Sequence, residues 1–194
     1  MKTLKALRTP EEVLRAAEEI ETFAPRTIHE SYRAFVSFFE GPLTQEQILQ
    51  GAYMIYGWMP TMLRLKGAKE AVYSAVNDAK EGRLTEAALS ACAKTLNNSL
   101  VGTTKLVHFA NPEAYPIWDS RVYRALHGER PYVYRVENTG AYLEFLGWVK
   151  EMEQARGFAN MKRRFETEAG YGVTSKRAAE AALYALGGKK KPSD

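Results

Sequence analysis

The chain has 194 residues, a formal net charge of +4, 45% hydrophobic side chains and 26% charged side chains. This composition is ordinary for a soluble globular protein with a sizeable core. The single cysteine, Cys92, excludes a disulfide framework and a four-cysteine metal site, while the slight basic excess is compatible with nucleic-acid binding without requiring it.

The first residues lack the apolar run of a signal peptide, and the sequence shows no metal motif. The longest mostly apolar stretch, residues 52–63, is too short to cross a membrane and contains Pro60. We therefore expect no membrane partner and a cytoplasmic location. The histidines His29, His108 and His127 are far apart and show no metal-ligand spacing. We expect no metal and no cofactor, and we expect His108 and Cys92, both in apolar helical patterns, to be core residues.

Helical periodicity runs through nearly the whole chain. Thr9, Pro10 and Glu12 form a helix-start signal, and Thr44 and Thr85 open two later helices. The expected helices, in chain order, run from residue 10 to before Pro25, from there to Gly41-Pro42, from Thr44 to about Gly57, over 68–80, from Thr85 to about Leu96, over 103–109, from Asp119 to His127, from Asn138 or Thr139 to about Ala155, over 159–169 and over 175–186. Residues 131–136 show the one β-like alternation.

These patterns predict an all-α protein, a globular array of about nine or ten short helices. We expect a single helical domain over residues 1–187, either undivided or in two lobes with a cleft between them, and a basic disordered tail over 188–194. Lysines 189–191 would be solvated or would form a weak phosphate-binding arm. The same two alternatives hold for the basic clusters 162–164 and 176–177.

The most informative segment is residues 102–126, GTTKLVHFANPEAYPIWDSRVYRAL. Two short helices around the turn 97–102 would form a hairpin whose second helix points its free amides at one spot, where a phosphate could bind. Thr103 and Thr104 could add hydroxyl donors. The alternative is a plain helix–turn–helix corner.

Asp119 stands immediately before the next helix. Its first expected role is an N-cap, with the carboxylate accepting backbone amides. Those hydrogen bonds and the helix dipole favour the charged form, which also suits a group that stabilises a developing cation. Asp119 could therefore be a cap alone, or a cap and a catalytic carboxylate.

The segment resembles the helix-hairpin-helix DNA glycosylases. Residues 100–105, LVGTTK, match the hairpin with its lysine, residues 111–116 match the loop, and residues 119–124, DSRVYR, match the helix opening. The match covers about 25 of the 194 residues. The chain departs from the family pattern in having only Gly102 in the hairpin and a shorter distance between Lys105 and Asp119.

The resemblance implies a glycosylase that extrudes a damaged or modified base from double-stranded DNA and hydrolyses its N-glycosidic bond. Asp119 would stabilise the cation-like sugar. Lys105 would attack the sugar carbon, giving lyase activity, or would contact a phosphate or solvent. The sequence does not name the base. The departures favour the alternative of a non-catalytic all-α module that binds DNA or a protein.

The remaining candidates surround these two residues. Gly102, Thr103 and Thr104 would contact DNA phosphates at the hairpin. Arg121 and Arg124, one helical turn apart, would grip phosphates or hold Asp119. Aromatic side chains near Gly57 could stack on the extruded base or belong to the core, and the candidates are Tyr56 and Trp58.

Overall fold

The computed structural model describes residues 7–188, and within this range every regular element is a helix. This confirms the expected all-α class, with eleven helices in the described range instead of nine or ten. The helices are α1 (Pro10–Ala17), α2 (Arg26–Phe38), α3 (Gln45–Trp58), α4 (Glu70–Lys80), α5 (Glu86–Thr95), α6 (Leu100–Ala110), α7 (Ser120–His127), α8 (Val133–Val136), α9 (Thr139–Gln154), α10 (Phe158–Ala169) and α11 (Ser175–Gly188). The expected tail lies, apart from Gly188, outside the described residues.

The helix starts follow the capping residues in the sequence. Thr9 and Thr44 form complete capping boxes at α1 and α3. Each threonine hydroxyl accepts a hydrogen bond from the amide of Glu12 or Gln47, and the side chain of that Glu or Gln accepts one from the threonine amide. Thr85 and Asn138 cap α5 and α9 through their side-chain oxygens. Local chemistry therefore sets these boundaries.

Two elements differ from the expectation. Residues 131–136, expected to be β-like, contain the one-turn helix α8, in which the amide of Val136 donates to the carbonyl of Tyr132. No neighbouring strand among the described residues could complete a ladder, so the alternation does not form one. Helix α6 begins at Leu100 instead of Thr103, because the Ser99 hydroxyl caps it by accepting the amide of Gly102.

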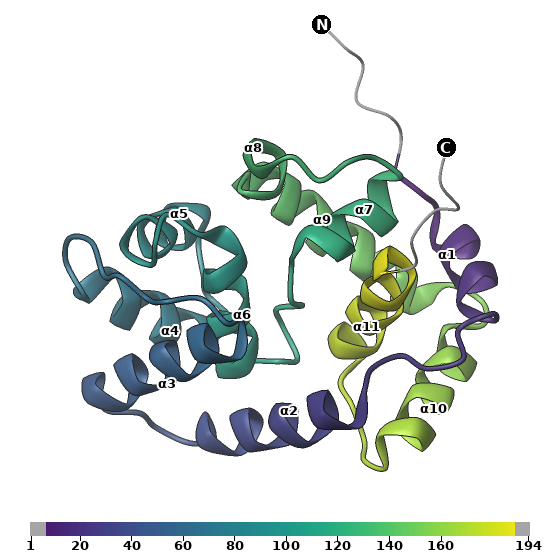
Figure 1. Cartoon of the computed structure of the whole chain (residues 1–194), viewed down its shortest axis with the longest axis horizontal. Coiled ribbons are helices and arrows are strands. Elements are labelled where there is room, and N and C mark those ends of the chain that lie inside the picture. The colour runs from purple at the N-terminus through teal and green to yellow at the C-terminus, as the bar shows by residue number, and fades with distance from the viewer. Residues whose placement is uncertain (1–6, 189–194) are drawn as a thin grey trace, which may run out of the picture.

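The helices bury two main apolar clusters. One joins α1 to α7, α9, α10 and α11, and the other joins α2 through α6. In Figure 1 the chain starts in the first lobe, crosses along α2 to the second, and returns through the segment between α6 and α7. Helix α11 is the centre of the first lobe, since all of its residues from Lys176 to Leu183 are buried.

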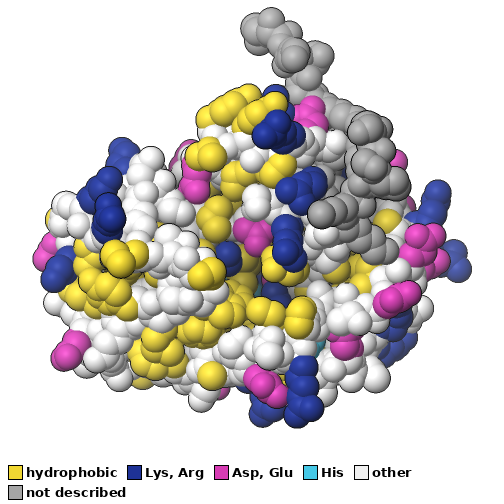
Figure 2. Space-filling view, viewed as in Figure 1, with side chains coloured by type: hydrophobic (Ala, Val, Ile, Leu, Met, Phe, Trp, Pro, Cys, Tyr) yellow, Lys and Arg dark blue, Asp and Glu magenta, His cyan; other side chains and the backbone are white. Residues whose placement is uncertain are grey.

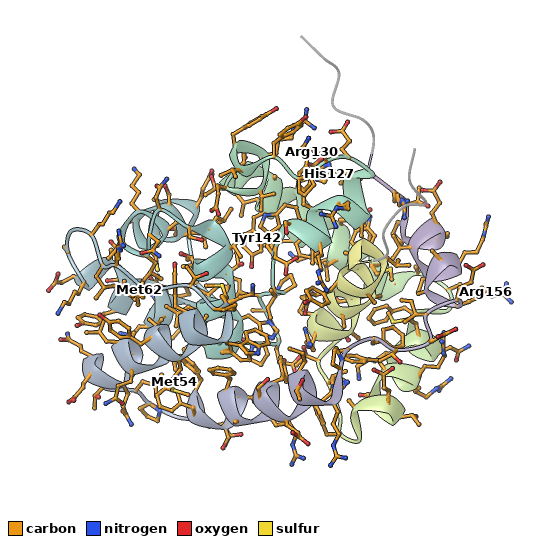
Figure 3. All side chains as sticks on the ribbon, in the orientation of Figure 1. Met54, Met62, His127, Arg130, Tyr142 and Arg156 are labelled. Atoms are coloured by element: carbon orange, nitrogen blue, oxygen red, sulfur yellow. The ribbon has the colours of Figure 1, made fainter. Side chains whose placement is uncertain are left out.

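The return segment 111–119 is tied to both lobes. The buried indole of Trp118 donates to the carbonyl of Val136 at 2.8 Å. The Thr104 hydroxyl donates to the Trp118 carbonyl at 3.1 Å. Tyr142 of α9, near the centre of Figure 3, donates its hydroxyl to the carbonyl of Pro116. These bonds fix the residue that follows, Asp119, relative to α6.

Helices α7 and α11 lie unusually close together. A Cβ atom on Gly187 would lie 2.0 Å from the carbonyl oxygen of Arg121, so only glycine permits this approach. The contact sets one wall of the site described below. No helix within residues 7–188 has both the length and the apolar character needed to cross a membrane.

Candidate functional site

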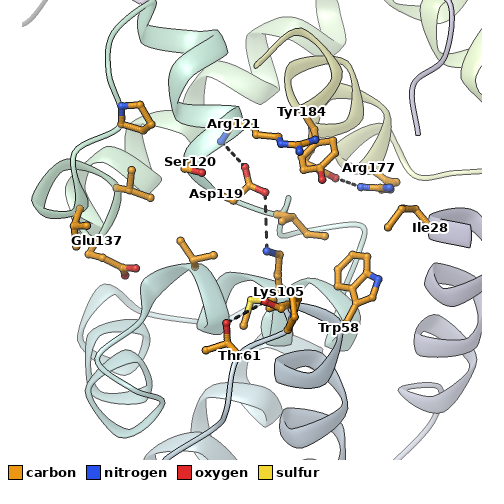
Figure 4. A pocket seen from close by; sticks show the side chains of 18 residues that line it. Ile28, Trp58, Thr61, Lys105, Asp119, Ser120, Arg121, Glu137, Arg177 and Tyr184 are labelled. Atoms are coloured by element: carbon orange, nitrogen blue, oxygen red, sulfur yellow. Dashed lines mark hydrogen bonds and ion pairs between the residues drawn. The ribbon is translucent and has the colours of Figure 1, made fainter. Parts of the chain in front are cut away.

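A pocket of about 600 Å³ opens where the two lobes meet. The second lobe contributes Trp58 and Lys105, and the first contributes Asp119, Arg121 and Tyr184. Figure 4 shows Lys105 rising from α6 toward Asp119, which points down from the start of α7. The pocket therefore brings the two predicted catalytic residues together.

Asp119 divides its two carboxylate oxygens between different tasks. Oδ1 accepts the amides of Arg121 and Val122 at 2.9 and 3.0 Å, which makes Asp119 the N-cap of α7. Oδ2 faces the Nζ of Lys105 at 4.0 Å. The cap thus orients the carboxylate and leaves one oxygen directed into the pocket (Figure 4).

Lys105 is an unusually enclosed lysine. Its side chain keeps 13% of its accessible surface and that of Asp119 keeps 12%. Burial lowers the pKa of the Lys105 ammonium, and the charges of Asp119 and Glu180 partly oppose that shift. At 4.0 Å the two groups attract each other without a direct hydrogen bond. The lowered pKa means that a larger fraction of the Lys105 amine is neutral at a given pH than for a solvated lysine.

A second charged pair lies at the inner end of the pocket. Arg177 and Glu180, both on α11 and almost fully buried, form an ion pair and line the same pocket. The Arg177 guanidinium also lies 4.6 Å from the ring centroid of Tyr32 on α2. Burial raises the pKa of the Glu180 carboxyl, and Arg177 opposes the shift. The basic cluster 176–177 is thus largely buried instead of solvated.

The two aromatic candidates have different positions. Trp58 is half-buried, lines the pocket and lies 5.9 Å from Lys105 Nζ by its ring centroid. Tyr56 is buried in the second lobe, and its hydroxyl donates to the carbonyl of Leu96 at 2.7 Å. The structure does not bring Tyr56 to the pocket, because its ring fills the space beside Gly102, where a Cβ would lie 2.3 Å from the Tyr56 hydroxyl.

The hairpin residues expected at DNA phosphates are enclosed as well. Thr103 and Thr104 are fully buried, and their hydroxyls donate to the carbonyls of Ser99 and Trp118. Gly102 is buried against Tyr56. All three lie inside α6 because this helix starts one turn earlier than expected. They therefore present no donors to a ligand at the surface.

The first amides of α6 are already satisfied within the protein. The Glu137 carboxylate, just after α8, accepts hydrogen bonds from the amide of Leu100 and, at 3.4 Å, from the Ser99 hydroxyl. A carboxylate at this position satisfies the helix N-terminus in the way a bound phosphate would. The anion site predicted at the hairpin is thus occupied by Glu137.

Arg121 lies in the first turn of α7 and Arg124 in its last turn, and both side chains contact α11. The Arg121 guanidinium lies 4.5 Å from the ring centroid of Tyr184 and lines the pocket. Arg124 donates to the carbonyl of Gly187 at 2.6 Å. Neither of these two described guanidinium groups donates a hydrogen bond to the Asp119 carboxylate, although the backbone amide of Arg121 does.

The core residues behave as expected from their apolar context. His108 is fully buried, with Nδ1 2.6 Å from the carbonyl of Tyr115 and Nε2 2.9 Å from the hydroxyl of Tyr32. Cys92 is fully buried, and burial raises its pKa to about 12. Within residues 7–188, no three His, Cys, Asp or Glu side chains gather closely enough to hold a metal ion.

The sequence patterns did not point to Glu137, Glu180 or Tyr184, and they marked Arg177 only as part of the basic cluster 176–177. The available signal was the segment KRAAEAALYAL, where one Arg and one Glu at i, i+3 spacing stand among alanines. Alanine on several faces of a helix indicates close packing all round, so its few charged side chains must be buried and paired. No comparable local signal marked Glu137.

Comparisons of the chain with protein-family models, with curated proteins and with solved structures gave no match.

Proposed function

We propose that this protein is a DNA glycosylase that excises a damaged or modified base by cleaving its N-glycosidic bond. The observation that carries the proposal is the enclosed pair of Lys105 Nζ and Asp119 Oδ2, 4.0 Å apart in a pocket of about 600 Å³. The resemblance of residues 100–124 to the helix-hairpin-helix glycosylases supplies the reaction class.

The chemistry follows from the charges in the pocket. When the glycosidic bond breaks, its electron pair leaves with the base and positive character develops on the sugar. The fixed Asp119 carboxylate stabilises that charge from within a poorly solvated site, where electrostatic interactions are strong. Water would then add to the sugar carbon, and the proton that it releases would pass to the departing base. In the alternative course, neutral Lys105 attacks this carbon and gives one amine proton to the departing base, the bond from the carbon to the ring oxygen breaks, a second amine proton passes to that oxygen, and the imine that forms permits strand cleavage.

The pocket also offers a place for the extruded base. Trp58 supplies an aromatic face at its wall, and Ile117 and Val136 add apolar surface. A base removed from the helical stack needs such contacts to offset the loss of pairing and stacking. Asp119 and Lys105 lie beside this surface, so the bond to be cleaved could come within reach of both.

The test is base release from oligonucleotides that each carry one deaminated, oxidised or alkylated base, offered as duplexes and as single strands. Asp119→Asn is the informative variant, because asparagine is as good an N-cap as aspartate and should preserve α7. We expect release to fall at least about 100-fold. Unchanged release by this variant would refute the role of the carboxylate.

Lys105 is tested by borohydride trapping, which converts an imine between lysine and sugar into a permanent crosslink. We expect a crosslinked band with wild type, no band with Lys105→Gln, and an unchanged band with the control Lys94→Gln, an exposed lysine of α5. Base release without any crosslink would assign the reaction to water. No release from any substrate by the folded protein would favour a non-catalytic binding module.

A further inference from the structure

Helix α8 exposes a row of large side chains beside the pocket. Tyr132, Val133 and Tyr134 keep 45%, 77% and 68% of their accessible surface. The two tyrosine rings are nearly parallel, at 17°, with centroids 5.9 Å apart. A contiguous exposed apolar patch with a polar rim often marks an interaction site.

Arginine surrounds these rings. The Arg130 guanidinium lies 5.3 Å from the centroid of the Tyr132 ring, and that of Arg135 lies 5.6 and 5.7 Å from the Tyr132 and Tyr134 rings. Arg130 lies at the outer edge of the molecule near α8 (Figure 3). Figure 2 shows yellow and dark blue side chains gathered over the α8 end of this face. The patch thus combines flat aromatic surfaces with positive charge.

The patch adjoins the pocket that contains Asp119. Pro131 and Val133, on either side of Tyr132, line that pocket. A second hollow of about 740 Å³ runs along α7 and shares Ser120, Arg121 and Pro131 with the first. Its lining includes Arg8, Arg121, Arg124 and Arg130, with Glu129 as its acidic side chain. We call this hollow the arginine groove.

The arginine groove is the better place for phosphates. The hairpin amides of α6 are satisfied by Ser99 and Glu137, so they have no capacity left for a nucleic-acid backbone. Glu129 forms an ion pair with Arg135, which reduces its repulsion of an anion in the groove. The positive charge that could attract DNA phosphates therefore lies on the α7–α8 side of the pocket.

We propose that α8 and the arginine groove bind single-stranded or locally unpaired DNA, with bases stacked on Tyr132 and Tyr134 and phosphates in the groove. The inference rests on the proposed function only in choosing DNA as the ligand. Aromatic side chains can stack on a base only where its face is free, which an intact duplex prevents. The site would therefore select DNA whose target base is already unpaired, a state in which extrusion costs least.

The experiment measures binding by fluorescence anisotropy and requires no catalysis. The probes are a labelled 12-nucleotide DNA strand of mixed sequence, the same strand annealed to its complement, and an RNA strand of the same sequence. We expect the DNA single strand to bind most tightly. Tyr134→Ala and Tyr132→Ala should each weaken that binding about tenfold, the usual effect of losing one stacked base. The control is Tyr53→Ala, because Tyr53 on α3 is 53% exposed and outside the pocket and the groove.

Salt dependence separates the two parts of the site. Loss of one phosphate contact in Arg130→Gln should reduce the slope of log K against log salt by about 0.7 for a single strand. Tyr134→Ala should leave the slope unchanged, because stacking releases no counterions. Both variants alter exposed side chains, and an unfolding curve like that of wild type shows that they are folded.

Three outcomes would overturn the inference: tighter binding of the duplex, tighter binding of RNA, or tyrosine variants that bind like wild type. Its failure is distinguishable from that of the proposed function. If binding depends on the tyrosines but no base is released, the strand-binding inference stands and the glycosylase proposal fails. If base is released but binding does not depend on either tyrosine, the glycosylase proposal stands and the strand-binding inference fails.

Discussion

At the residue scale, burial makes the contribution of His108 to stability depend on pH. The pKa of His108 is lowered to about 3, first by burial and then by the charge of Arg177. The neutral ring contacts both Tyr115 and Tyr32, so it joins α6 to the return segment and to α2. The expectation of a core histidine is confirmed, and the two specific partners come from the tertiary structure.

His108 predicts a loss of stability in acid. Its folded pKa lies below the unfolded value of about 6.5, so the unfolded chain takes up a proton first as the pH falls. The contribution of neutral His108 to the free energy of unfolding is complete above the unfolded pKa. It is lost as the pH falls toward the folded pKa of about 3, by at most about 1.4 kcal/mol per pH unit. Urea unfolding between pH 4.5 and 7.5 measures it, with His108→Gln as the comparison. The same pH dependence in the variant and wild type would contradict the assignment.

The sequence position of Asp119 correctly predicted its role as the N-cap of α7, because an acid before a helix is a strong local signal. The division of its oxygens between the α7 amides and the pocket could not be predicted, since it depends on where α6 places Lys105. For the same reason, the sequence could not tell whether Tyr56 or Trp58 would line the pocket. They are two residues apart on one helix, so they point in different directions, and only packing decides which one lines a pocket.

At the element scale, the start of α6 is the clearest departure from the sequence pattern. Ser99 and Glu137 together satisfy its first amides. The Ser99 cap is recognisable in the sequence, whereas Glu137 is 38 positions away from its partner Ser99. Helix starts with a nearby Thr or Asn were predictable, and those completed by a distant carboxylate were not.

Glu137 should therefore stabilise the protein. Glu137→Ala removes a carboxylate from a helix N-terminus and should lower the free energy of unfolding by about 1–2 kcal/mol. Glu144→Ala, an exposed glutamate within α9, should change it by less than about 0.5 kcal/mol. Chemical denaturation of both variants gives the comparison. Equal effects at the two positions would mean that Glu137 contributes nothing specific to α6.

At the scale of the whole molecule, the buried charges of α11 link the two lobes. Arg177 pairs with Glu180 on its own helix and lies over Tyr32, which belongs to the apolar cluster of the other lobe. The all-α class was predictable because helical periodicity is local. The pairing of lobes was not, because it depends on contacts between residues more than a hundred positions apart.

This pair predicts a non-additive double mutant. Arg177→Met or Glu180→Met alone leaves an unpaired buried charge and should cost about 3–5 kcal/mol of stability. The double variant removes both charges and should lose less than the two single variants together. Denaturant unfolding of all four proteins completes the cycle. Strict additivity would show that the two side chains act independently.

The division of the chain between lobes has a consequence for its biosynthesis. Helices α2 to α6 are consecutive and share one apolar cluster, so they can begin to pack as soon as α6 has left the ribosome. Helix α1 is made earlier and still needs α11 as a partner, so its own lobe cannot be completed before α11 has been made. The cavity between Lys105 and Asp119 then forms only after α11, because the wall that holds Asp119 depends on the close contact of α7 with α11 at Gly187.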